Sequence, residues 1–315
     1  MKNNKKRLAM LLAVVVLLGI SCVISNCRNH SLPELGNSTI RHKLVPQLKN
    51  TLPISTPKQF CPTNSSTVSA QTLILTDSFE DGLKDDWYRE MAQESYSGVV
   101  SNLYAKDGKS SFRVELRKSD PMVSEGKRAQ ILMIATDQSM LEYTYSFSML
   151  LPKGGNEDYA LDPYGSEIIA EWINSPDPGE EGTTPPLALR TINGMYVLER
   201  CWDDEAVTSN DQMTRQGKRA VYKLGSYEND KGKFVAWTFK VKWGWLAAQK
   251  PVMEIYKDSV KILDLDGLPN TTNDQKGVRL KLGISKWDWA QDQAHDWSLL
   301  EKRVIYYDDV SIKSS

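Results

Sequence analysis

Hydrophobic and polar residues alternate with a period of two along most of the chain after Thr72. In SSFRVEL, hydrophobic residues at every second position from Phe112 to Leu116 are separated by charged ones, and LEYTYSFSMLLP and KFVAWTFKVKWGW repeat the pattern. Such alternation is typical of strands with one buried face, and helical periodicity is almost absent. Many strands separated by Gly, Pro, Asn and Asp clusters predict an all-β fold. We expect an antiparallel β-sandwich of the jelly-roll type, in which the concave sheet commonly forms a groove.

The segment RLKLGISKWDW, from Arg279 to Trp289, shows what one polar strand face carries. Side chains alternate across a strand, so its hydrophobic residues are expected to face the core. The opposite face then holds a candidate site, formed by Lys281, Gly283, Ser285 and Trp287.

The N-terminus has the pattern of an export signal over residues 1–25. Basic residues precede a hydrophobic run from Leu8 to about Ile24. The small residue before Cys22 is similar to a bacterial lipoprotein cleavage box, so lipid attachment at Cys22, an uncleaved membrane anchor and a secretory signal cut near Ser25 all stay open. The protein is therefore expected to be exported to the periplasm, the cell surface or the extracellular space, where a membrane tether is one alternative.

Residues 26–71 are rich in Ser, Thr, Pro and Asn and contain few large hydrophobic side chains. Such a segment cannot bury enough surface to offset its ordering entropy, and we interpret it as a flexible tether. The folded domain is expected to span 72–315. Outside the cytoplasm, Cys61 and Cys201 are candidates for a disulfide, with a buried free thiol at Cys201 as the alternative.

The balance of charge limits the kind of partner. With 39 basic and 40 acidic residues, the formal net charge is -1. No global field attracts nucleic acid, so nucleic acid is not an expected partner, and a polyanion has to be held by a local cluster. We expect a monomer.

The two ends of the domain resemble extracellular jelly-roll carbohydrate modules, through DSFEDG near the start and YYDDVSI near the end. In those modules an acidic residue of the final strand often helps to hold a structural calcium ion. Asp77, Glu80 and Asp309 offer the oxygen ligands that calcium prefers. Surface carboxylates beside turns are the alternative, and no cofactor is expected to be required.

Several segments in order resemble bacterial and fungal polysaccharide lyases of the heparin-lyase, glucuronan-lyase and alginate-lyase type, which are β-jelly rolls. This resemblance implies a concanavalin-like sandwich with a concave carbohydrate groove. The resemblance covers most of residues 72–311. The segments that carry it are GKSSFRVEL, GKRAQI, YTYSFSMLLP, IIAEWINSPD, PPLAL, GKFVAWTFKVKW, MEIYKDSVKIL and KLGISKWDW.

The resemblance implies cleavage of an acidic, uronate-containing polysaccharide by β-elimination. Such an enzyme neutralises the uronate carboxylate, removes the C5 proton and protonates the leaving oxygen. Arg128 matches the arginine of the first family motif, and Gln130 stands where the relatives usually have Glu. In the next motif, Glu171 and Ile173 replace Gln and His.

The third family motif reads close to Lys-x-Gly-x-Tyr. Lys281 and Gly283 match it, but Ser285 replaces the tyrosine that serves as the proton carrier. A serine hydroxyl has no comparable acidity. The candidate replacement carriers are Glu171 as a base, although its charge would repel the substrate carboxylate, the lone domain histidine, His295, and four tyrosines, Tyr143, Tyr196, Tyr222 and Tyr256.

Substrate contacts are predicted from aromatic and basic residues on polar faces. We expect Trp172, Trp287 and Trp289 near the sugar, whereas Trp237 and Trp243 belong to the core. Arg113, Arg117 and Arg128 are candidates for a basic row that holds an anionic polysaccharide, and the alternative is a row of charges paired with Glu115 and other acids across the sheet.

Three functions remain open at this level. Polysaccharide lyase is the leading one, and a non-catalytic carbohydrate-binding protein on the same fold is the second. The third is a glycoside hydrolase that uses Glu171 with Glu167, predicted on the same strand face, or with another carboxylate, as a paired acid and base. The alternative for both glutamates is that they are solvated or ion-paired.

Overall fold

The computed structural model describes residues 71–134, 142–180, 182–208, 218–290 and 298–315. The chain divides into two units, Met1–Asn64 and Ser65–Ser315, and all the described residues belong to the second. The predicted export signal and nearly all of the predicted tether therefore lie outside them. No helix among the described residues is long and apolar enough to cross a membrane.

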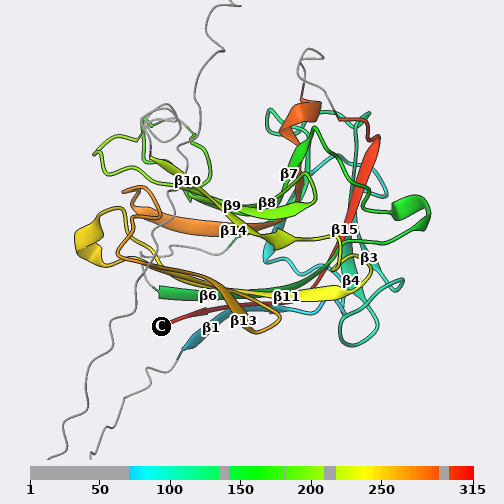
Figure 1. Ribbon diagram of the computed structural model, residues 1–315, viewed down its shortest axis with the longest axis horizontal. Helices are drawn as coiled ribbons and strands as arrows, with labels where there is room; N and C mark the ends of the chain where they lie inside the picture. The colour runs from blue at the N-terminus through cyan, green and yellow to red at the C-terminus, as the bar shows by residue number, and fades with distance from the viewer. Residues whose placement is uncertain (1–70, 135–141, 181, 209–217, 291–297) are drawn as a thin grey trace, which may run out of the picture. The chain divides into compact units, whose positions relative to one another are not determined.

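Two antiparallel sheets stack as layers, with three short 3-10 helices at their ends (Figure 1). Along the larger, eight-stranded sheet the order is β13 (Val260–Asp266), β12 (Val252–Lys257), β11 (Phe234–Lys242), β6 (Glu142–Leu150), β15 (Lys302–Ser314), β4 (Ser111–Arg117) and β3 (Gly98–Ser101), and β1 (Thr72–Asp77) pairs with β15. The seven-stranded sheet has the order β10 (Arg219–Ser226), β9 (Met195–Cys201), β8 (Leu187–Ile192), β7 (Ser166–Ser175), β14 (Lys276–Ser285), β5 (Arg128–Met133) and β2 (Trp87–Met91). The helices are η1 (Gly155–Glu157), η2 (Ala247–Gln249) and η3 (Trp287–Trp289).

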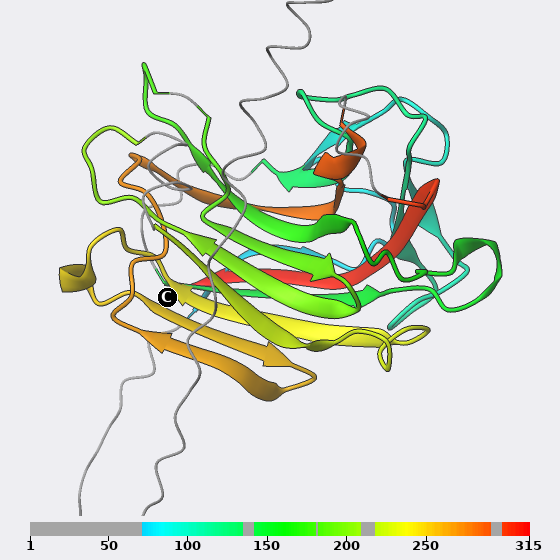
Figure 2. The same ribbon diagram turned by 45° about the horizontal axis from the view of Figure 1, so that its top comes forward.

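Most neighbouring strands in the two sheets are distant in sequence. β14 lies between β7 and β5, and β15 lies between β6 and β4. The first and last strands pair antiparallel, with Thr72 opposite Ser314. Seen with the top turned forward, β7, β8 and β9 cross over the larger sheet as a curved layer (Figure 2). The all-β, jelly-roll sandwich predicted from the alternation is confirmed.

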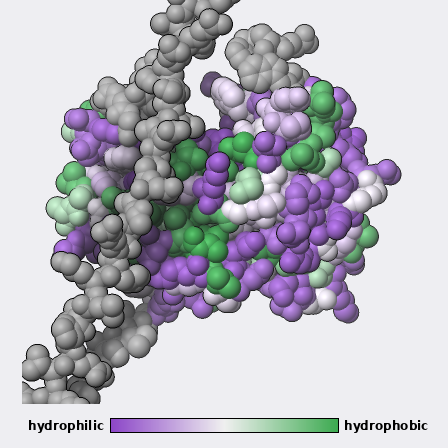
Figure 3. Space-filling view, in the orientation of Figure 1, coloured by the Kyte–Doolittle hydropathy of each residue, from purple (hydrophilic) through white to green (hydrophobic). Residues whose placement is uncertain are grey.

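The core lies between the layers and is built by the alternating hydrophobic residues. Phe112, Val114 and Leu116 are fully buried, as are Leu280, Leu282 and Ile284 of β14. In the view of Figure 3, hydrophobic residues are visible between hydrophilic ones where the layers face each other. The period of two thus correctly predicted the buried face of β4 and β14.

Gly283 permits the close approach of β14 to β5. Its φ is +133°, and a Cβ atom there would lie 2.3 Å from the Ala129 carbonyl oxygen and 2.7 Å from Gln130 Cα. Any other residue would force the two strands apart. The glycine therefore brings the polar side chains of β14 and β5 together.

Candidate functional site

Four neighbouring strands, β2, β5, β14 and β7, place polar side chains on the outer face of the seven-stranded sheet. Gln130 lies opposite Gly283 on one side and Glu90 on the other, and Lys281 lies opposite Glu171. Arg128 lies two residues before Gln130 on the same strand, so it shares this face. We call Glu90, Arg128, Gln130, Glu171 and Lys281 the outer-face cluster. It brings together all four catalytic residues that the sequence predicted.

Two cations, Arg128 and Lys281, lie beside two carboxylates, Glu90 and Glu171, in the outer-face cluster. The Lys281 ammonium forms an ion pair with Glu90, and its Nζ lies 3.8 Å from Glu171 Oε1. Gln130 Nε2 donates a hydrogen bond of 3.0 Å to Glu171 Oε1, and Arg128 Nη1 donates one of 3.2 Å to Glu90 Oε1. Because all five residues are mostly buried, these contacts hold the side chains in one arrangement.

Burial raises the pKa of the Glu90 carboxyl, but Lys281, Ser124 and Arg128 together outweigh burial and hold that pKa below its ordinary value. Glu90 is therefore ionised over the neutral pH range. Such a carboxylate can orient cations, but it is a poor general acid.

Apart from Glu90 Oε2, which forms the ion pair with Lys281, two buried polar atoms of the cluster have no hydrogen-bond partner among the described residues. They are Arg128 Nε, a donor, and Gln130 Oε1, an acceptor. Unpaired buried polar atoms are costly in an ordinary core, and they cluster where a ligand completes the hydrogen bonding. The pair fits an anionic group beside Arg128 and a hydroxyl beside Gln130.

Cationic side chains outnumber carboxylates on the rest of this face. Arg190 and Arg219 both pair with Glu199, and the Arg190 Nε to Glu199 Oε2 distance is 2.6 Å. Arg279 lies two residues before Lys281, opposite Ile173, and no ion pair with it is found among the described residues. The resulting excess of positive charge suits a polyanion more than a neutral glycan.

Two residues of β2 on this face were missed by the sequence analysis. Glu90 completes the cluster, and Tyr88, opposite Leu132, is 58% exposed. Strand β2 is the short edge segment WYREM, whose alternation is too brief to assign a face. Only the pairing of β2 with β5 reveals their place.

None of the tyrosines proposed as replacement proton carriers lies in the cluster. Tyr143 and Tyr196 are buried in the core, Tyr222 packs against the core, and Tyr256 belongs to the other sheet. All three histidines of the chain, including His295, lie outside the described residues. The outer-face cluster lies on one face of the seven-stranded sheet, and among the described residues Tyr88 is therefore the tyrosine on that face.

Two of the three tryptophans predicted to contact sugar are core residues. Trp172 is fully buried, with its ring centroid 4.5 Å from that of Phe239, and Trp289 is 4% exposed. Trp172 precedes Ile173 and follows Glu171, so the alternation turns its ring inward. The placement predicted for both is wrong. Trp287 is 72% exposed in η3, and Ser285 lies opposite Arg128 at the end of β14.

Arg113 does not extend the basic face of Arg128. It lies on β4 of the other sheet, where its Nη2 is 2.8 Å from Glu157 Oε1 and also contacts Glu115. The prediction of a single basic row through Arg113, Arg117 and Arg128 is wrong, and the ion-pair alternative is confirmed for Arg113 and Arg117, which both pair with Glu115.

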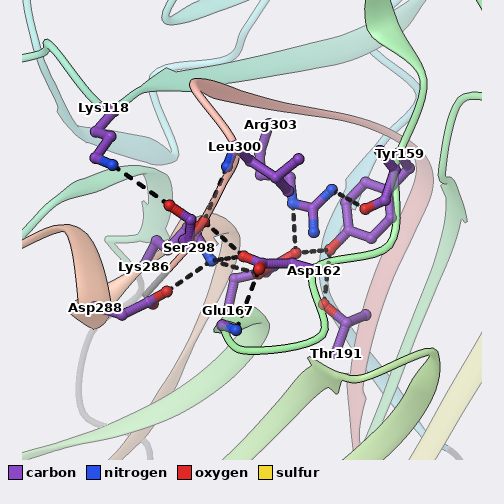
Figure 4. Close-up of polar contacts among 12 residues, drawn as sticks. Lys118, Tyr159, Asp162, Glu167, Thr191, Lys286, Asp288, Ser298, Leu300 and Arg303 are labelled. Carbon is purple, nitrogen blue, oxygen red and sulfur yellow. Dashed lines mark hydrogen bonds and ion pairs between the residues drawn. The ribbon is translucent and has the colours of Figure 1, made fainter. Parts of the chain in front are cut away.

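Glu167 lies inside the sandwich, in a buried charged cluster at the end of the sheets (Figure 4). Its carboxylate accepts a hydrogen bond of 2.6 Å from the Tyr159 hydroxyl, lies 3.0 Å from Lys286 Nζ and lies 2.6 Å from Arg303 Nε. The predicted common face of Glu167 and Glu171 is therefore wrong.

The three predicted calcium ligands make other contacts. Asp77 accepts from the Phe79 amide and from Trp87 Nε1, at 2.9 and 2.8 Å, and Glu80 Oε1 accepts from the Lys109 and Ser110 amides. Asp309 lies beside Asp308 and Asp107 instead. A calcium ion bound by these three residues stays a prediction.

Cys201 is buried at the end of β9, and burial is the largest cause that raises the pKa of its thiol to about 12. Cys61 lies outside the described residues, so the disulfide between them stays a prediction.

Comparisons with known proteins agree with this fold. A family model described as polysaccharide lyase matches residues 60–311. A search of curated proteins found no match.

Among solved structures, the endo-β-1,4-glucuronan lyase of the fungus Trichoderma reesei aligns at a TM-score of 0.55 and 17% identity, covering 74% of this chain and 96% of that one. A family 7 alginate lyase in complex with product aligns at a TM-score of 0.48 and 11% identity, covering 73% and 95%. An endo-1,3-β-glucanase from Streptomyces sioyaensis aligns at 0.48 and 12%, covering 81% and 99%. At these identities the likeness to the glucuronan lyase concerns the fold.

Proposed function

The chain belongs to the polysaccharide lyase family, and on that premise we propose that it cleaves an acidic, uronate-containing polysaccharide by β-elimination on the outer face of the seven-stranded sheet. The observation that carries the proposal is the outer-face cluster. A guanidinium, an ammonium and an amide converge there on adjacent strands, and their positions match the family motifs.

Arg128 is the group that would neutralise the uronate carboxylate. Its side chain is 17% exposed, and its Nε is free of hydrogen bonds while Nη1 is held by Glu90. Neutralising that carboxylate lowers the energy of the carbanion that forms when the C5 proton leaves. The ionised Glu90 fixes the guanidinium and does not consume its free donor.

Gln130 and Lys281 would complete the binding of the charged transition state. Gln130 is held through its Nε2 by Glu171, which leaves Oε1 available for a sugar hydroxyl. Lys281 is held between two carboxylates, so its positive charge is fixed before substrate arrives. Charges placed in advance need little reorganisation when negative charge develops.

Tyr88 is the group that we assign to proton transfer. Tyr88 and Lys281 both lie opposite Leu132, one on each side of it, so their backbones are roughly 10 Å apart across two strand spacings. Tyr88 thus lies on the same face as the outer-face cluster, across Leu132 from Lys281. An exposed tyrosine there can, as the phenolate, accept the C5 proton and then donate that proton as the phenol to the leaving oxygen, which Ser285 cannot do as well.

The function is tested by incubating the purified protein with uronate-containing and neutral polysaccharides while near-ultraviolet absorbance and reducing ends are followed together. β-Elimination creates an unsaturated product, so both signals rise on an acidic glycan. Arg128→Ala is expected to lower the rate by roughly 100-fold or more. Arg117→Ala is the matched control, since Arg117 lies on the other sheet with its side chain 43% exposed. Equal rates for the wild type and Arg128→Ala would contradict the proposal.

A second candidate function is binding of the same polysaccharide without cleavage. The observation in its favour is that Ile173 and Ser285 occupy the positions where the family has His and Tyr, and both contribute to the outer face. Retention of the protein on an acidic glycan column, with neither signal rising in the assay, would identify this function.

A further inference from the structure

Three acidic residues meet at one end of β7 and β14, away from the outer-face cluster. Asp177 and Glu180 lie in the loop after β7, and Asp274 lies just before β14. One carboxylate oxygen from each residue lies within 4.8 Å of the other two. The backbone supports this arrangement, because the Gln275 amide donates to Asp177 Oδ1 at 3.0 Å.

The carboxylate of Asp274 is buried and only half satisfied. The residue is 3% exposed. Its Oδ2 accepts hydrogen bonds of 2.7 Å from Asn174 Nδ2 and 2.6 Å from Thr272 Oγ1, whereas Oδ1 has no partner. With Oδ2 fully engaged, the free oxygen is the one available to the acidic group.

A second buried oxygen beside the group also has no hydrogen-bond partner in the described part of the chain. The Thr208 amide donates to Glu180 Oε1 at 3.1 Å, and the Thr208 hydroxyl, in a residue 2% exposed, is unpaired. Two unpaired oxygens next to three carboxylates point to a cation, which takes electron pairs from oxygen, rather than to another hydrogen-bond acceptor.

The negative charge of the group is not compensated by the protein. Among the described residues, no lysine or arginine forms an ion pair with Asp177, Glu180 or Asp274. Burial raises the pKa of Asp274, and the neighbouring Glu180 adds to the rise. The repulsion would be relieved either by a proton that Asp274 and Glu180 share or by a bound cation. The first requires a proton on the two carboxyl groups, whereas the second requires an ionised Asp274.

We propose that Asp177, Glu180 and Asp274 bind a calcium ion. Calcium prefers carboxylate, hydroxyl and carbonyl oxygens in irregular arrangements and tolerates ligands from flexible loops. The group offers carboxylates from two loops, and the nearby Thr208 belongs to a third. The ion would tie together the loops after β7, after β9 and before β14. This site is separate from the one predicted at Asp77, Glu80 and Asp309.

The test measures calcium bound per chain in the full-length protein after treatment with a chelator, by titration calorimetry and by thermal unfolding. The variant is Asp274→Asn, whose amide can accept from Thr272 and donate to Glu180 and so mimics a shared proton without adding charge. Asp309→Asn is the matched control, because it alters only the other predicted site.

The expected result is that Asp274→Asn binds one calcium ion fewer than the wild type, whereas Asp309→Asn keeps that ion. At a calcium concentration about 100 times the dissociation constant, the ion should raise the unfolding temperature of the wild type by roughly 5 °C or more, and Asp274→Asn should lose that rise. If Asp274→Asn binds as much calcium as the wild type, the proposal is overturned. It is equally overturned if neither protein binds calcium at this site and the variant is the more stable, because the carboxylates then share a proton.

Discussion

Glu167 and Glu171 lie four residues apart on β7 and yet face opposite sides of the seven-stranded sheet. The pairing of β7 with β8 shifts register between Ile168 and Ala170. A bulge of this kind inserts an extra residue and reverses the side to which the preceding residues point. Glu171 therefore joins the outer-face cluster, whereas Glu167 enters the buried charged cluster.

Replacing Glu167 should destabilise the fold. In Glu167→Gln, Lys286 and Arg303 would lose a shared carboxylate in a region where all three side chains are at most 2% exposed. Removal of one partner from a buried charge network costs about 3–5 kcal/mol. Urea unfolding should show this loss. Glu254→Gln, which breaks a pair with Lys261 at the surface, should cost less than about 1 kcal/mol.

A methyl group at Gly283 should separate β14 from β5. In Gly283→Ala the new Cβ would overlap the Ala129 carbonyl oxygen, so we expect a loss of about 3 kcal/mol or more in the free energy of unfolding. Gly82→Ala is the matched control. Its φ of +96° imposes comparable backbone strain, but nothing lies within 4 Å of the added atom. Similar losses in the two variants would show that backbone strain alone requires the glycine.

The alternation of residues predicted the sandwich because burial of one strand face is a local property. Leu280, Leu282 and Ile284 needed no knowledge of their neighbours to be placed in the core. The same rule placed Lys281 on the opposite face, and the family resemblance then added Arg128, Gln130 and Glu171.

The errors arose where a face depends on contacts between distant segments. The bulge near Ile169 is set by pairing with β8, so Glu167 could not be placed from its spacing. The error at Trp172 has another cause, because Trp172 directly follows Glu171 and strict alternation puts neighbouring side chains on opposite faces of the strand. Glu90 belongs to an edge strand whose role appears only when β2 pairs with β5.

Tyr88→Phe tests the proton carrier that we assign. The change removes one hydroxyl from a side chain that is 58% exposed, so the unfolding temperature should stay within about 1–2 °C of the wild type. If Tyr88 transfers the proton, kcat on the acidic polysaccharide should fall by roughly 100-fold, with little change in KM. Tyr164→Phe is the matched control, as an exposed loop tyrosine outside the sheets. A kcat unchanged in Tyr88→Phe would exclude the assignment.

Asp309 should make stability fall as the pH rises toward neutrality. Burial, Asp308 and Asp107 raise the pKa of Asp309 from an ordinary 3.8 to about 6 in the folded protein. The folded state then binds a proton more tightly than the unfolded state, so this contribution to stability is full below pH 3.8 and is lost as the pH rises through about 6.

Asp309→Asn removes that titration and tolerates the positive φ of 48° at this position. In the presence of a chelator, the variant should therefore unfold at a higher temperature than the wild type at pH 7, and the difference should shrink as the pH falls toward 4. Asp264→Asn, on the exposed strand β13, is the matched control for the loss of one carboxylate. A larger gain at pH 4 than at pH 7 would contradict the sign of the effect.

Trp287 is the aromatic surface on which we expect a sugar ring to stack. Trp287 lies in η3, just after β14, and is 72% exposed. It is next to the end of the outer face where Ser285 pairs with Arg128. Because it packs against little of the protein, Trp287→Ala should leave the unfolding temperature nearly unchanged. It should raise the dissociation constant for the acidic polysaccharide by roughly 3- to 10-fold, the size of a single aromatic contact.

Leu73→Ala is the control, since Leu73 is 55% exposed on β1 of the other sheet. Trp289→Ala would not serve, because Trp289 is a core residue and its loss would unfold part of the protein. Equal affinity of Trp287→Ala and Leu73→Ala for the polysaccharide would place the sugar elsewhere on the sheet. The cations Arg190, Arg219 and Arg279 would then be the next groups to replace.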